Sequence, residues 1–231
     1  PRLQQTGKYV CSEITIQQDN EYRGANYLLA LLVVILQAIT LLATVIGSRS
    51  GSCDGGMKKV ILSLALGTFG LGMAEFGIMG VLTELAHNVG ISIPAAGHMI
   101  SYYALGVVVG APIIALFSSR YSLKHILLFL VALCVIGNAM FTLASSYLML
   151  AIGRLVSGFP HGAFFGVGAI VLSKIIKPGK VTTAVAGMVS GMTVANLLGI
   201  PLGTYLSQEF SWRYTFLLIA VFNIAVMASV Y

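Results

Sequence analysis

The chain has 231 residues, of which 58% are hydrophobic and only 9% are charged, and its mean hydropathy is +0.94. Soluble domains carry roughly 25% charged residues, so this composition excludes a water-soluble globular protein and predicts a multi-spanning membrane protein. The formal net charge of +6 does not indicate a nucleic-acid partner, because the basic residues gather in short loops where they set membrane orientation.

Seven apolar segments are long enough to cross a bilayer, whose hydrocarbon core requires about 20 apolar residues per helix. In chain order they are 27–47, 60–83, 94–118, 125–144, 147–173, 182–206 and a last one that begins near 214. The pattern predicts an all-α membrane protein in which six spans follow one extra hydrophobic segment.

Loops with basic residues alternate with loops that have none. The basic ones contain Lys58 and Lys59, Arg120 and Lys124, and Lys174, Lys177 and Lys180. The loops at 84–93 and 145–146 contain no Lys or Arg. Basic loops stay in the cytoplasm, so we expect a multi-pass protein of the bacterial inner membrane with these three loops inside.

A repeat relates the two halves of the six-span region. The tripeptide Gly-Ala-Pro at 110–112 returns as Gly-Ile-Pro at 199–201, an offset of 89 residues (from 110 to 199) that also relates Ser118 to Ser207. Three apolar segments fit within this offset, and a unit with an odd number of crossings lies inverted relative to its twin. Inverted three-helix repeats are typical of secondary transporters, whose substrate site lies near the bilayer midplane.

The segment 1–56 has no counterpart in the repeat. It combines acidic and basic residues with the single apolar run 27–47. We expect the transporter bundle to occupy 57–231, with Met57 as its natural start, a truncated last span, and 1–56 as upstream or fused sequence. The alternative for 27–47 is the hydrophobic region of a signal sequence.

Glycines recur at four-residue spacing in several spans. They are Gly106 and Gly110; Gly158, Gly162 and Gly166; Gly187 and Gly191; and Gly199 and Gly203. In lipid, helices associate where small residues let their backbones approach, so these positions predict close helix crossings. Prolines within three spans, at 112, 160 and 201, can kink them.

Three ionisable residues lie inside apolar spans, where such groups are costly and indicate a functional site. Glu75 lies roughly 24 Å above the inner end of its helix, and Arg154 lies roughly 10 Å below the outer end of a roughly 30 Å core. The two are therefore expected at similar depth, as an ion pair or as members of one proton-linked network. His161 is seven residues further along the same span (from 154 to 161), about two turns deeper, and is suited to proton relay. The structural alternatives are an ion pair, a helix anchor and a packed histidine.

Other polar residues offer no catalytic arrangement. Tyr102, Tyr103 and Asn196 are candidates to line a substrate cavity. The sequence contains no nucleophile–base pair, zinc-ligand spacing or phosphate-binding loop, and its three cysteines are scattered. We therefore expect no enzyme, metal or cofactor site, and no ATP-driven transport within this chain.

From residue 57 onward the chain resembles the N-terminal half of a major facilitator superfamily transporter, in the twelve-span drug and sugar efflux branch. Four motifs carry the resemblance. They are Glu75-Phe76 with Gly80 in the first span, Arg154 with Gly158 and Gly162 in the fourth, the antiporter motif Gly199-Ile200-Pro201-Leu202-Gly203 in the fifth, and Trp212-Arg213 with Phe216 at the outer end before the sixth.

One motif departs from the family pattern. The loop between the second and third spans usually contains an aspartate, a glycine and two basic residues, but serines stand at 119 and 122 here. A gating salt bridge would therefore lack its aspartate. Arg120 and Lys124 keep the basic character of this gating loop.

The resemblance implies half of an alternating-access carrier, with a missing C-terminal six-span half as partner and the substrate cavity between the halves. It implies proton-coupled export of a small solute, such as a sugar or a drug-like compound, in which Glu75 carries the proton and Arg154 tunes it; His161 is a further candidate. The alternatives are a facilitator or importer of the same fold, and a non-transporting half-bundle that acts as a scaffold or is an inactive fragment. The partners expected are a small-molecule substrate, protons and the lipid bilayer, without nucleic acid.

Overall fold

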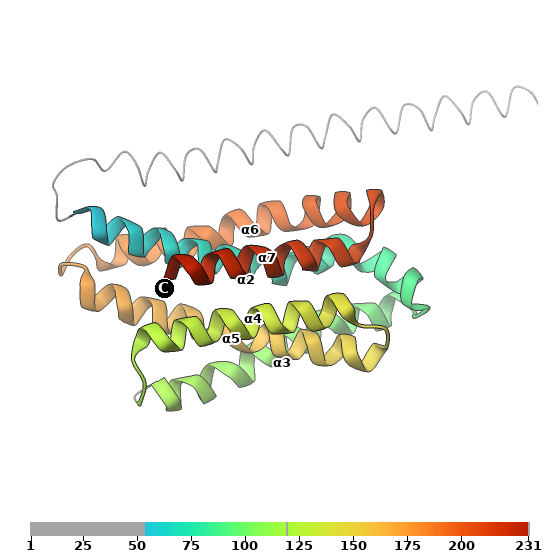
Figure 1. Cartoon of the computed structure of the whole chain (residues 1–231), viewed down its shortest axis with the longest axis horizontal. Coiled ribbons are helices and arrows are strands. Elements are labelled where there is room, and N and C mark those ends of the chain that lie inside the picture. The colour runs from blue at the N-terminus through green and yellow to red at the C-terminus, as the bar shows by residue number, and fades with distance from the viewer. Residues whose placement is uncertain (1–53, 119, 231) are drawn as a thin grey trace, which may run out of the picture. The chain divides into compact units, whose positions relative to one another are not determined.

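A computed structural model describes residues 54–118 and 120–230 of the chain. This part contains six helices, each long and apolar enough to cross a membrane, and Figure 1 shows them side by side. They are α2 (Asp54–Val89), α3 (Ile93–Ser118), α4 (Leu123–Leu143), α5 (Tyr147–Ile175), α6 (Val181–Glu209) and α7 (Trp212–Val230). The apolar segment expected at 27–47 lies outside the described residues.

The predicted spans agree with these helices to within about three residues, except for α2. That helix begins six residues before the predicted limit of 60 and ends six residues after the limit of 83. Backbone N–H and C=O groups in a bilayer must be hydrogen-bonded within the helix. The same helical hydrogen bonds continue through the polar residues at the membrane surface, so the helix is longer than its apolar core. At its outer end, the Asn88 side chain donates to the Glu84 carbonyl at 3.1 Å and also contacts the Glu84 carboxylate.

Two tight turns reproduce the repeat in backbone conformation. Gly90 follows α2 with φ of 70°, and Gly179 precedes α6 with φ of 90°. Glycine adopts this left-handed region without steric penalty. The two positions are 89 residues apart (from 90 to 179), so the same kind of turn joins the first two helices of each repeat. Neither glycine belongs to the four-residue spacings or to the Gly-x-Pro repeat noted in the sequence.

The contacts between helices follow a twofold pattern, in which two three-helix units can be exchanged without changing which kinds of contact are made. The first unit is α2, α3 and α4, and the second is α5, α6 and α7. The principal contacts pair α2 with α6 and α3 with α5, followed by α4 with α5 and α7 with α2, while α4 and α7 pack on each other. Exchanging the units converts each contact into another member of the set. Figure 1 shows α2 and its twin α5 running in opposite directions, which confirms the predicted inversion.

Glycines make the two principal crossings possible. A Cβ atom added at Gly110 of α3 would collide with the Phe159 carbonyl of α5, and one added at Gly191 of α6 would collide with the Ala65 carbonyl of α2. The predicted small-residue contacts are therefore confirmed at both crossings. They hold α3 against α5 and α6 against α2 at backbone distance.

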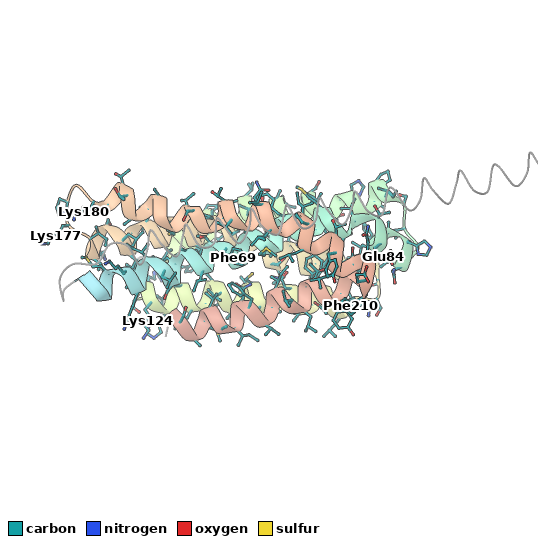
Figure 2. The ribbon with its side chains drawn as sticks, turned by 90° about the horizontal axis from the view of Figure 1, so that it is seen from above. Phe69, Glu84, Lys124, Lys177, Lys180 and Phe210 are labelled. Atoms are coloured by element: carbon teal, nitrogen blue, oxygen red, sulfur yellow. The ribbon has the colours of Figure 1, made fainter. Side chains whose placement is uncertain are left out.

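Charged side chains distinguish the two ends of the bundle. Figure 2 shows Lys124, Lys177 and Lys180 at one end, and Glu84 and Phe210 at the other. Because Lys59 lines one cavity together with Lys124 and Lys174, all three basic segments share this end, as the positive-inside rule requires of cytoplasmic loops. The opposite end is the outer one in the description that follows.

Candidate functional site

A buried arginine joins three helices in the outer half of the bundle. Arg154 of α5 is 0% exposed. Its Nη1 donates to the Ala74 carbonyl of α2 at 2.7 Å, and its Nε donates to the Met99 carbonyl of α3 at 3.3 Å. The guanidinium also lies 4.4 Å from the centre of the Tyr103 ring, within the range of a cation–π contact. A buried charge requires such partners, so Arg154 fixes the crossing of α2, α3 and α5.

Glu75 faces a histidine rather than this arginine. Its Oε2 lies 3.6 Å from Nε2 of His161, with 32% of the glutamate side chain and 6% of the histidine side chain exposed. This is an ion-pair distance when His161 is protonated, slightly longer than a hydrogen bond. A small side-chain movement can therefore make or break the contact. The glutamate side chain is partly exposed, although its Oε2 atom, which faces the histidine, is buried, and the histidine is enclosed.

Tyr103 completes the cluster from α3. Its hydroxyl group donates to the Leu71 carbonyl at 3.2 Å and lies 2.8 Å from Nδ1 of His161. A hydroxyl has one proton, so while it donates to Leu71 it accepts a hydrogen bond from Nδ1–H. The Nε2 atom that faces Glu75 is then unprotonated in a neutral ring and protonated only in a charged one. In the neutral ring, Nε2 with its lone pair is therefore the atom that lies 3.6 Å from the Glu75 carboxyl group.

The structure brings together the three ionisable residues singled out in the sequence. Arg154 bonds the carbonyl of the residue next to Glu75, which agrees with the similar depth deduced from helical rise. His161, the third candidate, is the residue that contacts the carboxylate. The tyrosine that links His161 to Arg154 was expected only as a cavity residue. No spacing rule could have found this link, because 58 residues separate Tyr103 from His161.

The three residues proposed to line a cavity occupy different places. Tyr103 is 2% exposed and lies inside the cluster. Its neighbour Tyr102 is half-buried, with its hydroxyl 3.5 Å from that of Tyr147. Asn196 is exposed on α6. Of these three candidates, Tyr102 and Asn196 are therefore the ones with exposed side-chain surface.

The antiporter motif packs directly behind Glu75. Gly199 and Gly203 are buried and face Phe76 and Gly77 of α2. Pro201 lies between these glycines within α6 and is half-buried. The glycines let α6 approach α2 at the turn that immediately follows Glu75, so the motif sets the position of the helix that bears the carboxylate.

The proposed gating loop lies at the basic end of the bundle, where Figure 2 shows Lys124. The cluster around Glu75 lies in the outer half. Arg120 is exposed, and its backbone N–H donates to the Phe117 carbonyl at 3.1 Å. Lys124 lies in the first turn of α4 at the mouth of a cavity. Ser119, which stands at the family's aspartate position, is not among the described residues.

Two inverted three-helix units around an enclosed ionisable cluster define a multi-pass membrane protein of the inverted-repeat carrier class. The sequence model described as Major Facilitator Superfamily matches residues 64–231. The chain belongs to this superfamily, a family of transporters rather than enzymes, and the resemblance deduced from its motifs is confirmed.

Three relatives illustrate the similarity. "Putative transporter AraJ" of Escherichia coli (strain K12) is 99% identical over 175 residues, which are 76% of this chain and 44% of the relative. The run Met57-Lys58-Lys59-Val60-Ile61-Leu62-Ser63 by itself predicts a resemblance to this relative, and the comparison confirms it. "Inner membrane transport protein YdhP" of the same organism is 41% identical over 171 residues, 74% of this chain and 44% of the relative. "Chloramphenicol resistance protein" of Streptomyces lividans is 28% identical over 165 residues, 71% of this chain and 42% of the relative. The chain spans about half the length of the curated relatives it matches.

Proposed function

We propose that residues 57–231 form the N-terminal half of a secondary transporter of the inner membrane, which exports a small solute in exchange for protons by alternating access. A second six-span bundle supplies the other half. The observation that carries the proposal is the Glu75–His161 pair at 3.6 Å, with one partly exposed member and one enclosed member. Such a pair can take up a proton from one side and hold it away from water. The name of the YdhP relative supports the inner membrane.

In this mechanism each member of the cluster has one task. Glu75 receives the proton because its side chain is the accessible one, and His161 forms the ion pair when the carboxylate is free. Arg154 keeps a fixed positive charge beside the exchanging group, since arginine is not deprotonated in proteins. Its bonds to the Ala74 and Met99 carbonyls tie that charge to α2 and α3, so a proton-dependent change at Glu75 can be felt by both helices.

The names of relatives and the polar side chains that are exposed on the bundle support a class of substrate. A relative named for chloramphenicol resistance supports a drug-like solute, and the family resemblance supports a sugar as the other candidate. Tyr102 and Asn196 are polar and accessible, so they are the residues we assign to the wall of the substrate cavity. The wall opposite comes from the second bundle.

The decisive experiment replaces Glu75 by glutamine in the complete transporter. We expect Glu75→Gln to abolish uphill export of the transported solute in inverted membrane vesicles while protein levels remain normal, because glutamine cannot exchange a proton. The matched control is Glu84→Gln, which removes a half-buried carboxylate near the outer end of the same helix, away from the cluster. Normal pH-dependent export by Glu75→Gln would refute the coupling role.

A facilitator or an importer of the same fold makes a different prediction. Collapsing the proton gradient with an uncoupler should stop export if the proposal holds. Solute movement that persists down its own gradient would indicate a facilitator, and proton-dependent accumulation inside cells would indicate an importer. A half-bundle that serves only as a scaffold would transport nothing even when joined to the second bundle.

A further inference from the structure

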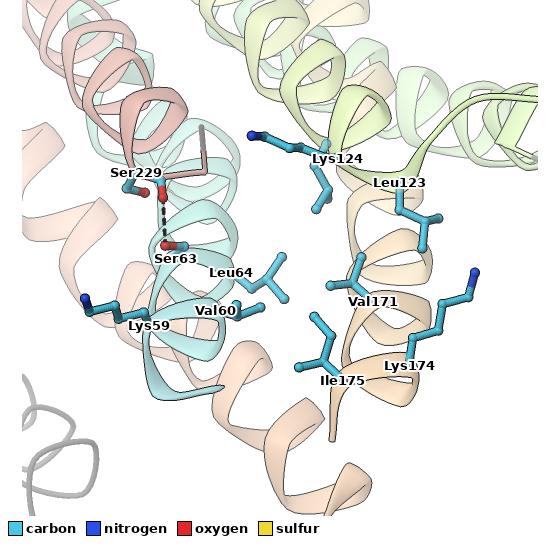
Figure 3. Close-up of a pocket in the computed structure, with 11 residues that line it drawn as sticks. Lys59, Val60, Ser63, Leu64, Leu123, Lys124, Val171, Lys174, Ile175 and Ser229 are labelled. Carbon is cyan, nitrogen blue, oxygen red and sulfur yellow. Dashed lines mark hydrogen bonds between the residues drawn. The ribbon is translucent and has the colours of Figure 1, made fainter. Parts of the chain in front are cut away.

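A cavity of about 410 Å³ opens at the basic end of the bundle, between α2, α4, α5 and α7. Its interior is apolar. Figure 3 shows Val60 and Leu64 of α2 facing Val171 and Ile175 of α5 across it. The Ser63 hydroxyl is engaged, since it donates to the Ser229 carbonyl at 3.2 Å. A soluble ion would gain nothing from such walls.

Three lysines from three different helices surround this apolar interior: Lys59 of α2, Lys124 of α4 and Lys174 of α5. Figure 3 shows their ammonium groups directed away from the apolar side chains, as expected when long basic side chains reach for the membrane surface. No acidic residue is among the described residues that line the cavity. The mouth of the cavity is therefore positively charged, and its interior is apolar.

A second, separately lined apolar groove lies between α4 and α7, two of the helices that line the cavity. It has a volume of about 590 Å³ and is lined by Leu128, Phe129, Ala132, Ile224, Met227 and Ala228. Two of its residues directly adjoin the cavity lining in sequence, since Leu128 follows Leu127 and Ala228 precedes Ser229. Phe129 and Ile224 are 58% and 50% exposed, so the groove is open along its length.

We propose that this site binds an anionic phospholipid of the cytoplasmic leaflet. The headgroup lies over the mouth of the cavity, which Lys59, Lys124 and Lys174 make positively charged, and one acyl chain lies along the groove between α4 and α7. Charge complementarity selects the lipid class, because basic pockets between helices on the cytoplasmic side attract anionic headgroups. A neutral lipid would fill the groove without using the lysines. The inference is independent of proton coupling at Glu75, which lies in the outer half of the bundle.

The test is competition between two lipids that differ in headgroup charge. The purified full chain is titrated in detergent with phosphatidylglycerol or with phosphatidylcholine of the same acyl chains, and bound lipid is counted by native mass spectrometry. We expect tighter binding of phosphatidylglycerol. Each lysine near a lipid surface contributes about fivefold in affinity, so Lys59→Gln, Lys124→Gln and Lys174→Gln together should weaken binding on the order of 100-fold. Equal binding of the two lipids by the unmodified chain would overturn the proposal.

The matched control removes three lysines from the same end that do not line the cavity. Lys58→Gln, Lys177→Gln and Lys180→Gln change the net charge equally, and this variant should keep the original preference for phosphatidylglycerol. If it loses the preference as fully as the first triple variant, the effect is one of overall charge and the site is refuted. Thermal unfolding of both variants verifies that each is folded.

Two further measurements separate the parts of the ligand. Ala132→Trp fills the groove without changing charge, and it should weaken phosphatidylglycerol binding; unchanged affinity would refute the assignment of the acyl chain. Inorganic phosphate at millimolar concentration should not displace the lipid, because it cannot use the apolar walls. Displacement by phosphate would identify a simple anion site and overturn the lipid.

Discussion

Tyr103 is an uncharged residue that connects the charged members of the cluster formed by Glu75, Arg154 and His161. Its hydroxyl bonds the Leu71 carbonyl and Nδ1 of His161, and its ring faces the guanidinium of Arg154. The same side chain therefore orients the histidine and contacts the arginine. Since Glu75 meets the opposite ring nitrogen, the hydroxyl of Tyr103 decides which nitrogen of the neutral histidine presents a lone pair to the carboxylate.

Removing that hydroxyl provides a direct test. We expect Tyr103→Phe to remain folded, since it keeps the ring over Arg154 and loses hydrogen bonds worth about 1–3 kcal/mol. The neutral His161 ring should change from one tautomer, protonated at Nδ1, to a mixture of two. Nitrogen-15 NMR of histidine-labelled protein distinguishes these forms, with His161→Gln used to assign the signal and Tyr102→Phe as the neighbouring control. An unchanged His161 signal in Tyr103→Phe would contradict the orienting role.

At the scale of helices, two helices cross at the positions where small residues let their backbones come close together. Along α3, Gly106 and Gly110 lie against the carbonyls of Leu155 and Phe159 on α5. These crossings keep α5 in place, and α5 bears both Arg154 and His161. Glycine costs a helix roughly 1 kcal/mol relative to alanine, so its use at these positions reflects packing rather than helix propensity.

Two glycines of the same helix make this argument quantitative. We expect Gly110→Ala to destabilise the bundle by about 1–3 kcal/mol, because the added methyl group overlaps a backbone carbonyl that cannot move alone. Gly97→Ala adds the same methyl group to α3 where nothing lies within 4 Å, and it should be neutral or stabilising by up to roughly 1 kcal/mol. Thermal unfolding midpoints in detergent measure both changes. Equal midpoints for the two variants would show that the crossing tolerates the group.

At the scale of the whole bundle, the two repeats are interlocked rather than placed side by side. The principal partner of α2 is α6, and that of α3 is α5, so each repeat packs mainly on its twin. The contacts of α2 with α3, and of α5 with α6, are minor by comparison. A single repeat would expose most of the surface on which its helices pack.

Splitting the bundle tests this interdependence. We expect residues 54–144 and 145–231, expressed separately, to be degraded rapidly in the membrane, because neither fragment contains the principal partners of its own helices. Expressed together, they should copurify and resist limited proteolysis. A variant of 145–231 with Gly191→Leu, which disrupts the α2–α6 crossing, serves as a control that should fail to rescue. A protease-resistant first repeat on its own would disprove the interlocked arrangement.

The sequence alone predicted the six described spans, with limits that miss clearly only at the two ends of α2, and it predicted the inverted repeat and the family. It also located Glu75, Arg154 and His161, because an ionisable residue in an apolar run stands out by its cost. Only the tertiary structure decided which of these residues meet. His161 rather than Arg154 faces Glu75, and Tyr103 contacts both His161 and Arg154. It also placed three lysines that are distant in the sequence around one cavity. The reason lies in rotation about each helix axis. Ile114 is 6% exposed and Leu116 is 76% exposed, yet both are apolar, since lipid and protein interior favour the same residues. A membrane span therefore does not encode in its hydrophobicity which face meets a neighbour, and only the packed bundle reveals it.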